Sequence, residues 1–304
     1  MNNEKTVAQE FLNSWVLPAN AKIAFQNFLE AVNGTNVQNQ ETALKEIYDI
    51  LDSVVLGDQK EQFEKELHLG ETYYRARIIR PEDYGKVETG ISRSCDDKFS
   101  GYNEINSREP ILGISGVGRN NLAGVSYLYV ASNESTACME VKSQFGDLIS
   151  LATFVIQQPL VVIDFSSDKA FDRELSIQHN LSMGVFFTLL MSHYSEPVKD
   201  NRSYRATQIV SDYLRKTGID GVAYRSSLSP EGVNYTIFNS HPSNIKYVGS
   251  KILIHKQANH SFWDLNEEKA IFSNPEGKML EYDSAIAKQQ KDRLKTFVKI
   301  RDDS

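Results

Sequence analysis

A series of short β-rich runs is the feature of this sequence that most restricts its fold. Several of these runs adjoin without a helix-forming stretch between them. The runs are Tyr73 to Ile79, Val125 to Ala131, Leu148 to Ile156, Leu160 to Phe165, Gly221 to Tyr224, Val233 to Phe238 and Ile245 to Ile254. A doubly wound parallel sheet needs a helical crossover between successive strands, and that regular alternation is missing. We therefore predict an α+β fold with a mixed or antiparallel β core.

Helical patterns precede and separate these runs. From Ala8 to about Leu69 apolar residues recur three or four positions apart, which predicts two or three helices. Three later helices are predicted at Ser135 to Phe145, Leu181 to Tyr194 and Tyr204 to Lys216. The chain then divides into a helical N-terminal segment (1–70), a main α+β domain (71–256) and a partly helical C-terminal extension (257–304).

Composition and charge exclude several classes of protein. A formal net charge of -7 argues against binding to the phosphate backbone, so no direct nucleic-acid contact is expected. No apolar run approaches the roughly 20 residues that span a bilayer, so we expect no membrane partner and a cytoplasmic location. Cys95 and Cys138 lack CxxC spacing, and the six histidines are spaced irregularly, so the pattern implies no metal site.

A glycine-rich stretch ends in an arginine. Gly113, Gly116 and Gly118 lead toward a strand, whereas a dinucleotide-binding fingerprint lies between a strand and a helix. Arg119 follows directly, and a guanidinium beside backbone without side chains can bind phosphate oxygens in a bidentate manner. The stretch is therefore either a surface loop or a binding site for an anionic substrate.

Two tyrosines and a glutamate follow this stretch. Tyr127 and Tyr129 share one face of a predicted strand, either as core residues or as an aromatic platform for a flat ligand. Glu140 lies at the border of the apolar face of a helix that Asn133 is expected to cap. Such a glutamate is either an ordinary surface residue or a carboxylate that lines a cleft. Cys138, on the apolar face, is expected in the core.

Arginine and serine side chains occur at two other strands. Arg75 and Arg77 have the same parity in the first β-rich run, which suggests either surface ion pairs or an anionic partner. Ser226 stands at the end of a later strand, where a hydroxyl can donate to a ligand or close a turn.

Six blocks of sequence, taken in order, resemble the RES domain family, which is named for its Arg, Glu and Ser. The blocks are Tyr74 to Arg77, Gly118 to Gly124, Tyr127 to Ala131, Ala137 to Glu140, Asp220 to Ser226 and Gly232 to Phe238. The resemblance covers about residues 73–254. One block differs from the family pattern, because Gly-Arg-Asn-Asn lacks the usual tryptophan.

The resemblance implies a fold related to ADP-ribosyltransferases and an enzyme that degrades NAD. NAD is then the substrate, no other cofactor is needed, and phosphate or water accepts the ADP-ribosyl group. Carried over by position, the family pattern gives Arg119, Tyr129 and Glu140 catalytic roles. It gives substrate-binding roles to Arg75 and Ser226. We add Arg77, which has the same strand parity as Arg75, and Tyr127, which shares a strand face with Tyr129.

Many members of this family are toxins of bacterial toxin-antitoxin pairs, which implies an Xre-type antitoxin as a protein partner. Two alternatives remain open at this point. One is an ADP-ribosyltransferase that modifies a protein, and the other is a binding module without catalysis.

Overall fold

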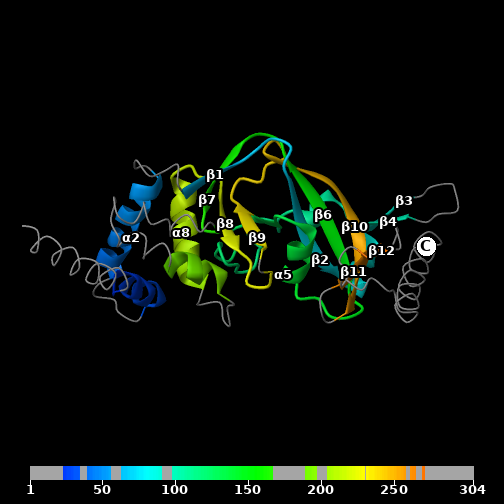
Figure 1. Cartoon of the computed structure of the whole chain (residues 1–304), viewed down its shortest axis with the longest axis horizontal. Helices are drawn as coiled ribbons and strands as arrows, with labels where there is room; N and C mark the ends of the chain where they lie inside the picture. Colours follow the sequence, from blue (N-terminus) through cyan, green and yellow to red (C-terminus); the bar gives the residue numbers. More distant parts are fainter. Residues whose placement is uncertain are drawn as a thin grey trace, which may run out of the picture.

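The computed structural model describes residues 23–34, 40–55, 63–90, 98–166, 189–196, 204–229, 231–257, 261–264 and 269–270. These residues form an α+β fold around a twelve-stranded sheet (Figure 1). The strands are β1 (Glu64–Leu67), β2 (Thr72–Ile79), β3 (Val87–Gly90), β4 (Lys98–Tyr102), β5 (Leu128–Ala131), β6 (Leu148–Ile156), β7 (Leu160–Asp164), β8 (Gly221–Arg225), β9 (Val233–Ile237), β10 (Ile245–Gln257), β11 (Ser261–Asp264) and β12 (Lys269–Ala270).

The sheet is mixed, as the sequence predicts. Its order is β1-β7-β8-β9-β5-β2-β6-β10-β11-β12, and β4 pairs with both β3 and β10. Strands β7 and β8 pair in parallel, whereas the other described pairs are antiparallel. The short connections between strands fit this result, because an antiparallel pair needs no helical crossover.

The sheet is weakly joined between β2 and β5. Strand β2 pairs with β6 along its whole length, but it pairs with β5 only through Tyr74 and Ala131. Helix α5 (Glu134–Glu140) packs against both strands at this junction. Small buried side chains, Ala76, Ala131 and Ala137, lie between the helix and the strands, so the helix approaches the sheet closely.

The N-terminal helices pack against the rest of the molecule and share a core with it. Residues 23–33 and α2 (Gln40–Val55) are helical, and α2 lies on the outer side of α8 (Arg205–Lys216) in Figure 1. The rings of Tyr48 on α2 and Tyr213 on α8 stack with centroids 4.6 Å apart. Many apolar side chains of this cluster are fully buried, for example Phe28, Ile47, Leu51 and Leu214.

The helical prediction for the first seventy residues is wrong at its end. Residues Glu64–Leu67 form β1, which pairs with β7 in antiparallel register. The four residues include two glutamates and a lysine, which favour helix, but Leu67 is fully buried and the edge of β7 offers backbone hydrogen bonds. Tertiary pairing therefore overrides local propensity here.

Two predicted boundaries also differ from the structure. The strand predicted from Val125 begins only at Leu128, and the helix predicted to Phe145 ends at Glu140. The chain must turn after Glu140 to reach β6. Lys142 adopts a positive φ of 50°, and Asp147 Oδ2 accepts a 2.7 Å hydrogen bond from Gln144 N. Strands β3 and β4 are not recognisable in the sequence.

Parts of several predictions lie outside the described residues, among them residues 1–22, 35–39 and 56–62 of the predicted helical N-terminal segment. Of the helix predicted at 181–194, residues 189–194 are described and are helical. In the C-terminal extension, β11 and β12 continue the sheet, and residues 271–304 are outside the described ranges, as is Cys95. No helix in the described part of the chain is long and apolar enough to cross a membrane.

Truncation of Leu151 tests the packing under helix α5. This residue lies in the central strand β6 and is fully buried beside Ala76 and Cys138. We expect Leu151→Ala to lower the free energy of unfolding by about 2–5 kcal/mol, because burial is lost and a cavity is left. Urea unfolding measures this change. Lys246→Ala, at an exposed position of β10, serves as the control and should change the value by less than about 0.5 kcal/mol.

Candidate active site

Glu140 ends helix α5, and the capping of the helix determines where its carboxylate lies. The side chain of Asn133 accepts a 2.8 Å hydrogen bond from Thr136 N, so the predicted N-cap is present. Thr136, Ala137 and Cys138 are buried against the sheet. Glu140 is exposed at the other end of the helix, where it faces two cavities.

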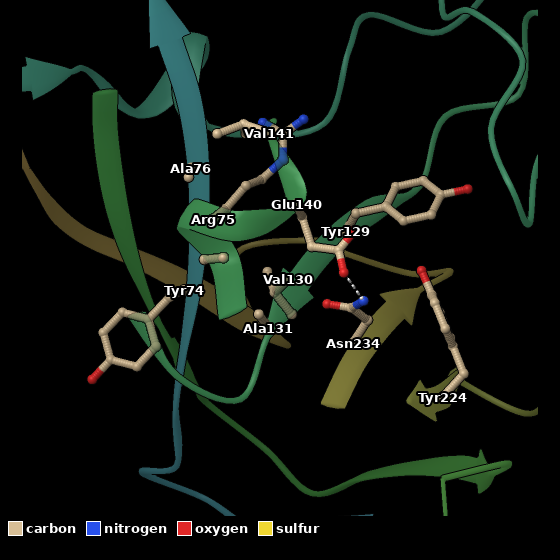
Figure 2. Close-up of a pocket in the computed structure, with 11 residues that line it drawn as sticks. Tyr74, Arg75, Ala76, Tyr129, Val130, Ala131, Glu140, Val141, Tyr224 and Asn234 are labelled. Atoms are coloured by element: carbon tan, nitrogen blue, oxygen red, sulfur yellow. Dashed lines mark hydrogen bonds between the residues drawn. The ribbon is translucent and has the colours of Figure 1, made fainter. Parts of the chain in front are cut away.

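One oxygen of Glu140 is held by two side chains from neighbouring strands. Its Oε1 accepts hydrogen bonds from Ser226 Oγ at 2.6 Å and from Asn234 Nδ2 at 2.7 Å. Figure 2 shows the second of these bonds at the centre of the site. No hydrogen bond from the described residues engages Oε2. The carboxylate is therefore fixed through one oxygen, and the other is available to a ligand.

The hydroxyl of Ser226 orients Glu140. Its oxygen accepts hydrogen bonds from Leu228 N and Ser229 N, both at 3.1 Å. With these donors directed at the oxygen, the hydroxyl proton points to Glu140. Ser226 is 8% exposed, and its place at the end of β8 agrees with the sequence prediction. The structure thus gives this serine a positioning contact.

Tyr129 forms an aromatic wall beside Glu140. Its hydroxyl donates to Asn121 Oδ1 at 2.6 Å and accepts from Asn120 N at 3.0 Å. Burial raises the pKa of this hydroxyl well above its usual value, so it stays protonated at neutral pH. The ring is held at its polar end by the glycine-rich stretch, and it lines both cavities.

Arg119 lies on the far side of the site from Arg75. Its guanidinium donates to the carbonyl oxygens of Glu196 at 2.8 Å and His193 at 3.3 Å. It also lies over the rings of Tyr204 and Tyr224, at 5.3 and 5.7 Å from their centroids. No carboxylate in the described part of the chain forms an ion pair with this cation, so its charge can still act on an anionic ligand.

Arg75 and Arg77 hold the segment that leads out of helix α4 (Glu104–Ser107). Arg75 Nη1 donates to Ser107 O at 2.7 Å and to Arg108 O at 2.9 Å, and Arg77 Nη2 donates to Arg108 O at 2.9 Å. Burial and the charge of Arg77 lower the pKa of Arg75 to about 9. Arg75 is therefore still a cation at neutral pH, and an anion bound beside it would stabilise its charge.

Two adjoining cavities meet at Glu140. The Arg75 cavity has a volume of about 260 Å³ and the Arg119 cavity about 330 Å³. They share four lining residues: Tyr129, Glu140, Tyr224 and Asn234. Lys142 and Arg225 also line the Arg119 cavity. Together the cavities form a cleft with one carboxylate at its centre and basic side chains on both sides, large enough for an extended ligand.

Comparison of the sequence with known protein families identifies the family of this chain. The RES domain model matches residues 92–255, which is more than half of the chain. The chain belongs to the RES domain family. Arg119, Tyr129, Glu140 and Ser226 all fall within the matched RES domain, whereas Arg75 and Arg77 precede it although they line the same region of the structure.

Comparison with solved structures and curated proteins adds little to this assignment. One similar solved structure is the M. tuberculosis MbcT-MbcA toxin-antitoxin complex, at 16% identity and a TM-score of 0.35. The similarity covers 64% of this chain and 89% of that chain. No curated protein matches the sequence.

Five of the seven predicted site residues line the cleft or bond to a residue that does, namely Arg75, Arg119, Tyr129, Glu140 and Ser226. Arg77 lines an adjoining cavity instead, and Tyr127 lines none of them. Tyr127 is 4% exposed, precedes β5 and packs against Phe238 with ring centroids 4.9 Å apart. It lines neither cavity. Cys138 is 1% exposed, and burial raises the pKa of its thiol, as expected of a core residue.

The sequence analysis missed several residues that line the cleft. Tyr224 and Asn234 line both cavities, and Lys142 lines one of them. A buried asparagine inside the apolar strand β9 is the signal that could have revealed Asn234, because such an amide needs a partner.

Among the described residues, no cluster of His, Cys, Asp and Glu could hold a metal ion.

Substitution of Gly118 tests how the glycine-rich stretch holds Tyr129. A Cβ atom at Gly118 would lie 2.3 Å from Asn121 Oδ1 and 2.7 Å from Tyr129 Oη. Gly118→Ala should therefore separate this hydrogen-bonded pair and lower the free energy of unfolding by about 1–3 kcal/mol, measured in urea. Gly116→Ala in the same stretch is the matched control, because a Cβ there meets nothing within 4 Å. Equal effects of the two substitutions would contradict this account.

Proposed function

We propose that this RES domain protein cleaves the bond between nicotinamide and ribose in NAD, with phosphate or water as the acceptor. One observation carries the proposal: Glu140 lines both cavities, and its Oε1 is held by two donors while no described residue donates to Oε2. Cleavage leaves positive charge on the ribose, as in glycoside hydrolysis, and a carboxylate oxygen beside it stabilises that charge.

The bonds that change are few. The C–N bond between ribose and nicotinamide breaks, and both of its electrons go to the ring nitrogen, so a cation leaves as a neutral base. An oxygen of phosphate or water then bonds to the ribose carbon. If water is the acceptor, its second proton passes to the solvent or to Glu140. Glu140 stabilises the developing charge in either case.

The other residues of the cleft would bind the substrate. Tyr129 and Tyr224 offer aromatic rings to the pyridinium, an attraction worth about 0.5–2 kcal/mol. Arg75 and Arg119 lie on opposite sides of Glu140 and suit the negative charges of the pyrophosphate or of an acceptor phosphate. Ser226 and Asn234 act through Glu140, as residues that position its carboxylate.

Replacement of Glu140 and Arg119 tests the proposal. The wild type should consume NAD and release nicotinamide, with ADP-ribose 1-phosphate or ADP-ribose as the second product. Glu140→Gln and Arg119→Ala should each lower kcat/KM about 30- to 1,000-fold, because each removes a charge aimed at the reaction. Product analysis by mass spectrometry, with and without phosphate, identifies the acceptor. Undiminished turnover in both variants would rule out this site.

A control variant makes the result specific. Tyr127→Phe is a matched change of a buried tyrosine outside both cavities and should retain activity close to that of the wild type.

Two further measurements test the alternative functions. Labelled NAD reveals transfer to protein, since label on a protein would instead indicate an ADP-ribosyltransferase. A protein whose melting temperature does not respond to NAD or ADP-ribose, and which consumes no NAD, would be a module without this function.

We further propose that the protein is a toxin held in check by an Xre-type antitoxin. Family membership supports this role, and so does a group of exposed apolar side chains. Ile111, Leu112 and Ile114 are 70–76% exposed in the stretch that leads to Arg119. Exposed apolar side chains grouped in this way are typical of a protein-binding surface.

Growth of an expressing bacterium tests the toxin proposal. Expression of the wild type should arrest growth and deplete NAD, and expression of Glu140→Gln should not. Co-expression of a helix-turn-helix protein encoded in the neighbouring reading frame should restore growth. Leu112→Asp should abolish this rescue while toxicity persists, because a charge in an apolar interface disfavours binding. Growth unaffected by the wild type would contradict the proposal.

A further inference from the structure

A third cavity continues the cleft beyond Arg75. It has a volume of about 330 Å³ and lies where β2 meets the 3-10 helix η2 (Pro81–Lys86). We call it the Arg80 cavity. Its lining residues with polar groups are Arg77, Arg80, Asp83, Lys86, Tyr102 and Asn106. Ala76 and Val141 line both this cavity and the Arg75 cavity, so the two adjoin.

The Arg80 cavity carries an excess of positive charge. Its single carboxylate, Asp83, already accepts hydrogen bonds from Lys86 at 2.6 Å and from the Tyr102 hydroxyl at 3.2 Å. The Lys86 ammonium and the Tyr102 bond lower the pKa of Asp83, so it is ionised and paired at neutral pH. Arg77 and Arg80 are left as a surplus of two charges.

The guanidinium groups of these two arginines have N–H donors that form no hydrogen bond with a described residue. Arg77 gives one donor to Arg108 O, and no described carboxylate forms an ion pair with it. The Arg80 side chain is exposed and makes no hydrogen bond or ion pair with a described residue, although its charge acts on the nearby Asp83 carboxylate. Like charges held close together destabilise one another, and the net charge of the chain is -7, so a local cluster of cations needs a reason.

The cations follow a line that leads away from Glu140. Arg75 and Arg77 lie on the same face of β2, and Arg80 follows the end of that strand. At roughly 3.3 Å per residue, Arg80 is about 16 Å along the backbone from Arg75. Arg75 is at the near end of the line, in the lining of the same cavity as Glu140. A ligand with its reactive end at Glu140 would therefore place its other end in the Arg80 cavity.

We propose that the Arg80 cavity binds a phosphate on the adenosine ribose, so that the enzyme prefers the phosphorylated dinucleotide NADP to NAD. This inference rests on the proposed function, because it assumes nicotinamide at Glu140. The pyrophosphate then lies near Arg75, and the additional phosphate meets Arg77 and Arg80. Guanidinium groups bind phosphate oxygens through paired donors, and they accommodate the 2′-phosphate of NADP in other dinucleotide sites.

Binding of fragments that lack nicotinamide tests the subsite apart from catalysis. The probes are adenosine 2′,5′-bisphosphate and adenosine 5′-monophosphate, titrated into the full chain by calorimetry. The wild type should bind the bisphosphate about tenfold or more tightly than the monophosphate, because one charge-assisted contact is worth at least that factor. Arg80→Glu should bring the ratio of the two dissociation constants close to one, and Arg80→Gln should lower it less.

A matched charge reversal controls for general electrostatic attraction. Lys246→Glu changes the charge by the same amount at an exposed site that lines none of the three cavities, and it should keep the wild-type ratio. The Arg80 side chain has no hydrogen bond or ion pair with a described residue to lose, so its variants should melt within a few degrees of the wild-type temperature. Equal binding of the two fragments by the wild type would overturn the proposal, and so would a ratio that Arg80→Glu leaves unchanged.

Cleavage assays relate the subsite to the reaction. The wild type should cleave NADP with a kcat/KM about tenfold above that for NAD, and Arg80→Glu should lower this ratio about ten- to a hundredfold. Failure to cleave either dinucleotide would refute the proposed function, whereas the ratio of fragment affinities decides the subsite by itself. Cleavage of NAD with no preference for NADP would refute the specificity and leave the proposed function standing.

Discussion

The two hydrogen bonds to Glu140 Oε1 connect the end of helix α5 to strands β8 and β9. Ser226 and Asn234 supply them from different strands, and the Ser226 oxygen is itself held by two backbone N–H groups. The carboxylate is thus oriented by a side chain of β9 and by a serine that backbone N–H groups of the β8–β9 loop hold, and not by a flexible salt bridge. Such preorganisation lets a charged group stabilise a developing charge without first rearranging.

The space for the cleft arises from the junction of β2 and β5. One residue pair joins these strands, and α5 packs against both of them at this junction. Both cavities that meet at Glu140 include β5 residues, and one includes β2 residues as well. The cleft therefore depends on a sheet that is interrupted in its middle, while the strands on each side keep long, regular pairing.

Local patterns in the sequence predicted the elements but not all of their contacts. Alternating and continuous apolar runs located β6 to the residue, and the Asn133 cap located the start of α5, because both signals depend on neighbours in the chain. Asn234 reaches Glu140 across 94 positions, which only the strand order reveals. Likewise, Arg75 binds backbone carbonyls, and a backbone acceptor has no sequence signature.

The place of β2 in the sheet defines the smallest part of this protein that can be a folding unit. The family match begins at residue 92, yet β2 lies between β5 and β6 and β1 covers the edge of β7. A chain cut at the start of the match would lose the strand that joins the two halves of the sheet. It would also expose backbone donors and acceptors on four strands, β4, β5, β6 and β7. Unpaired strand edges promote aggregation. The boundary of sequence similarity is therefore not the boundary of cooperative folding.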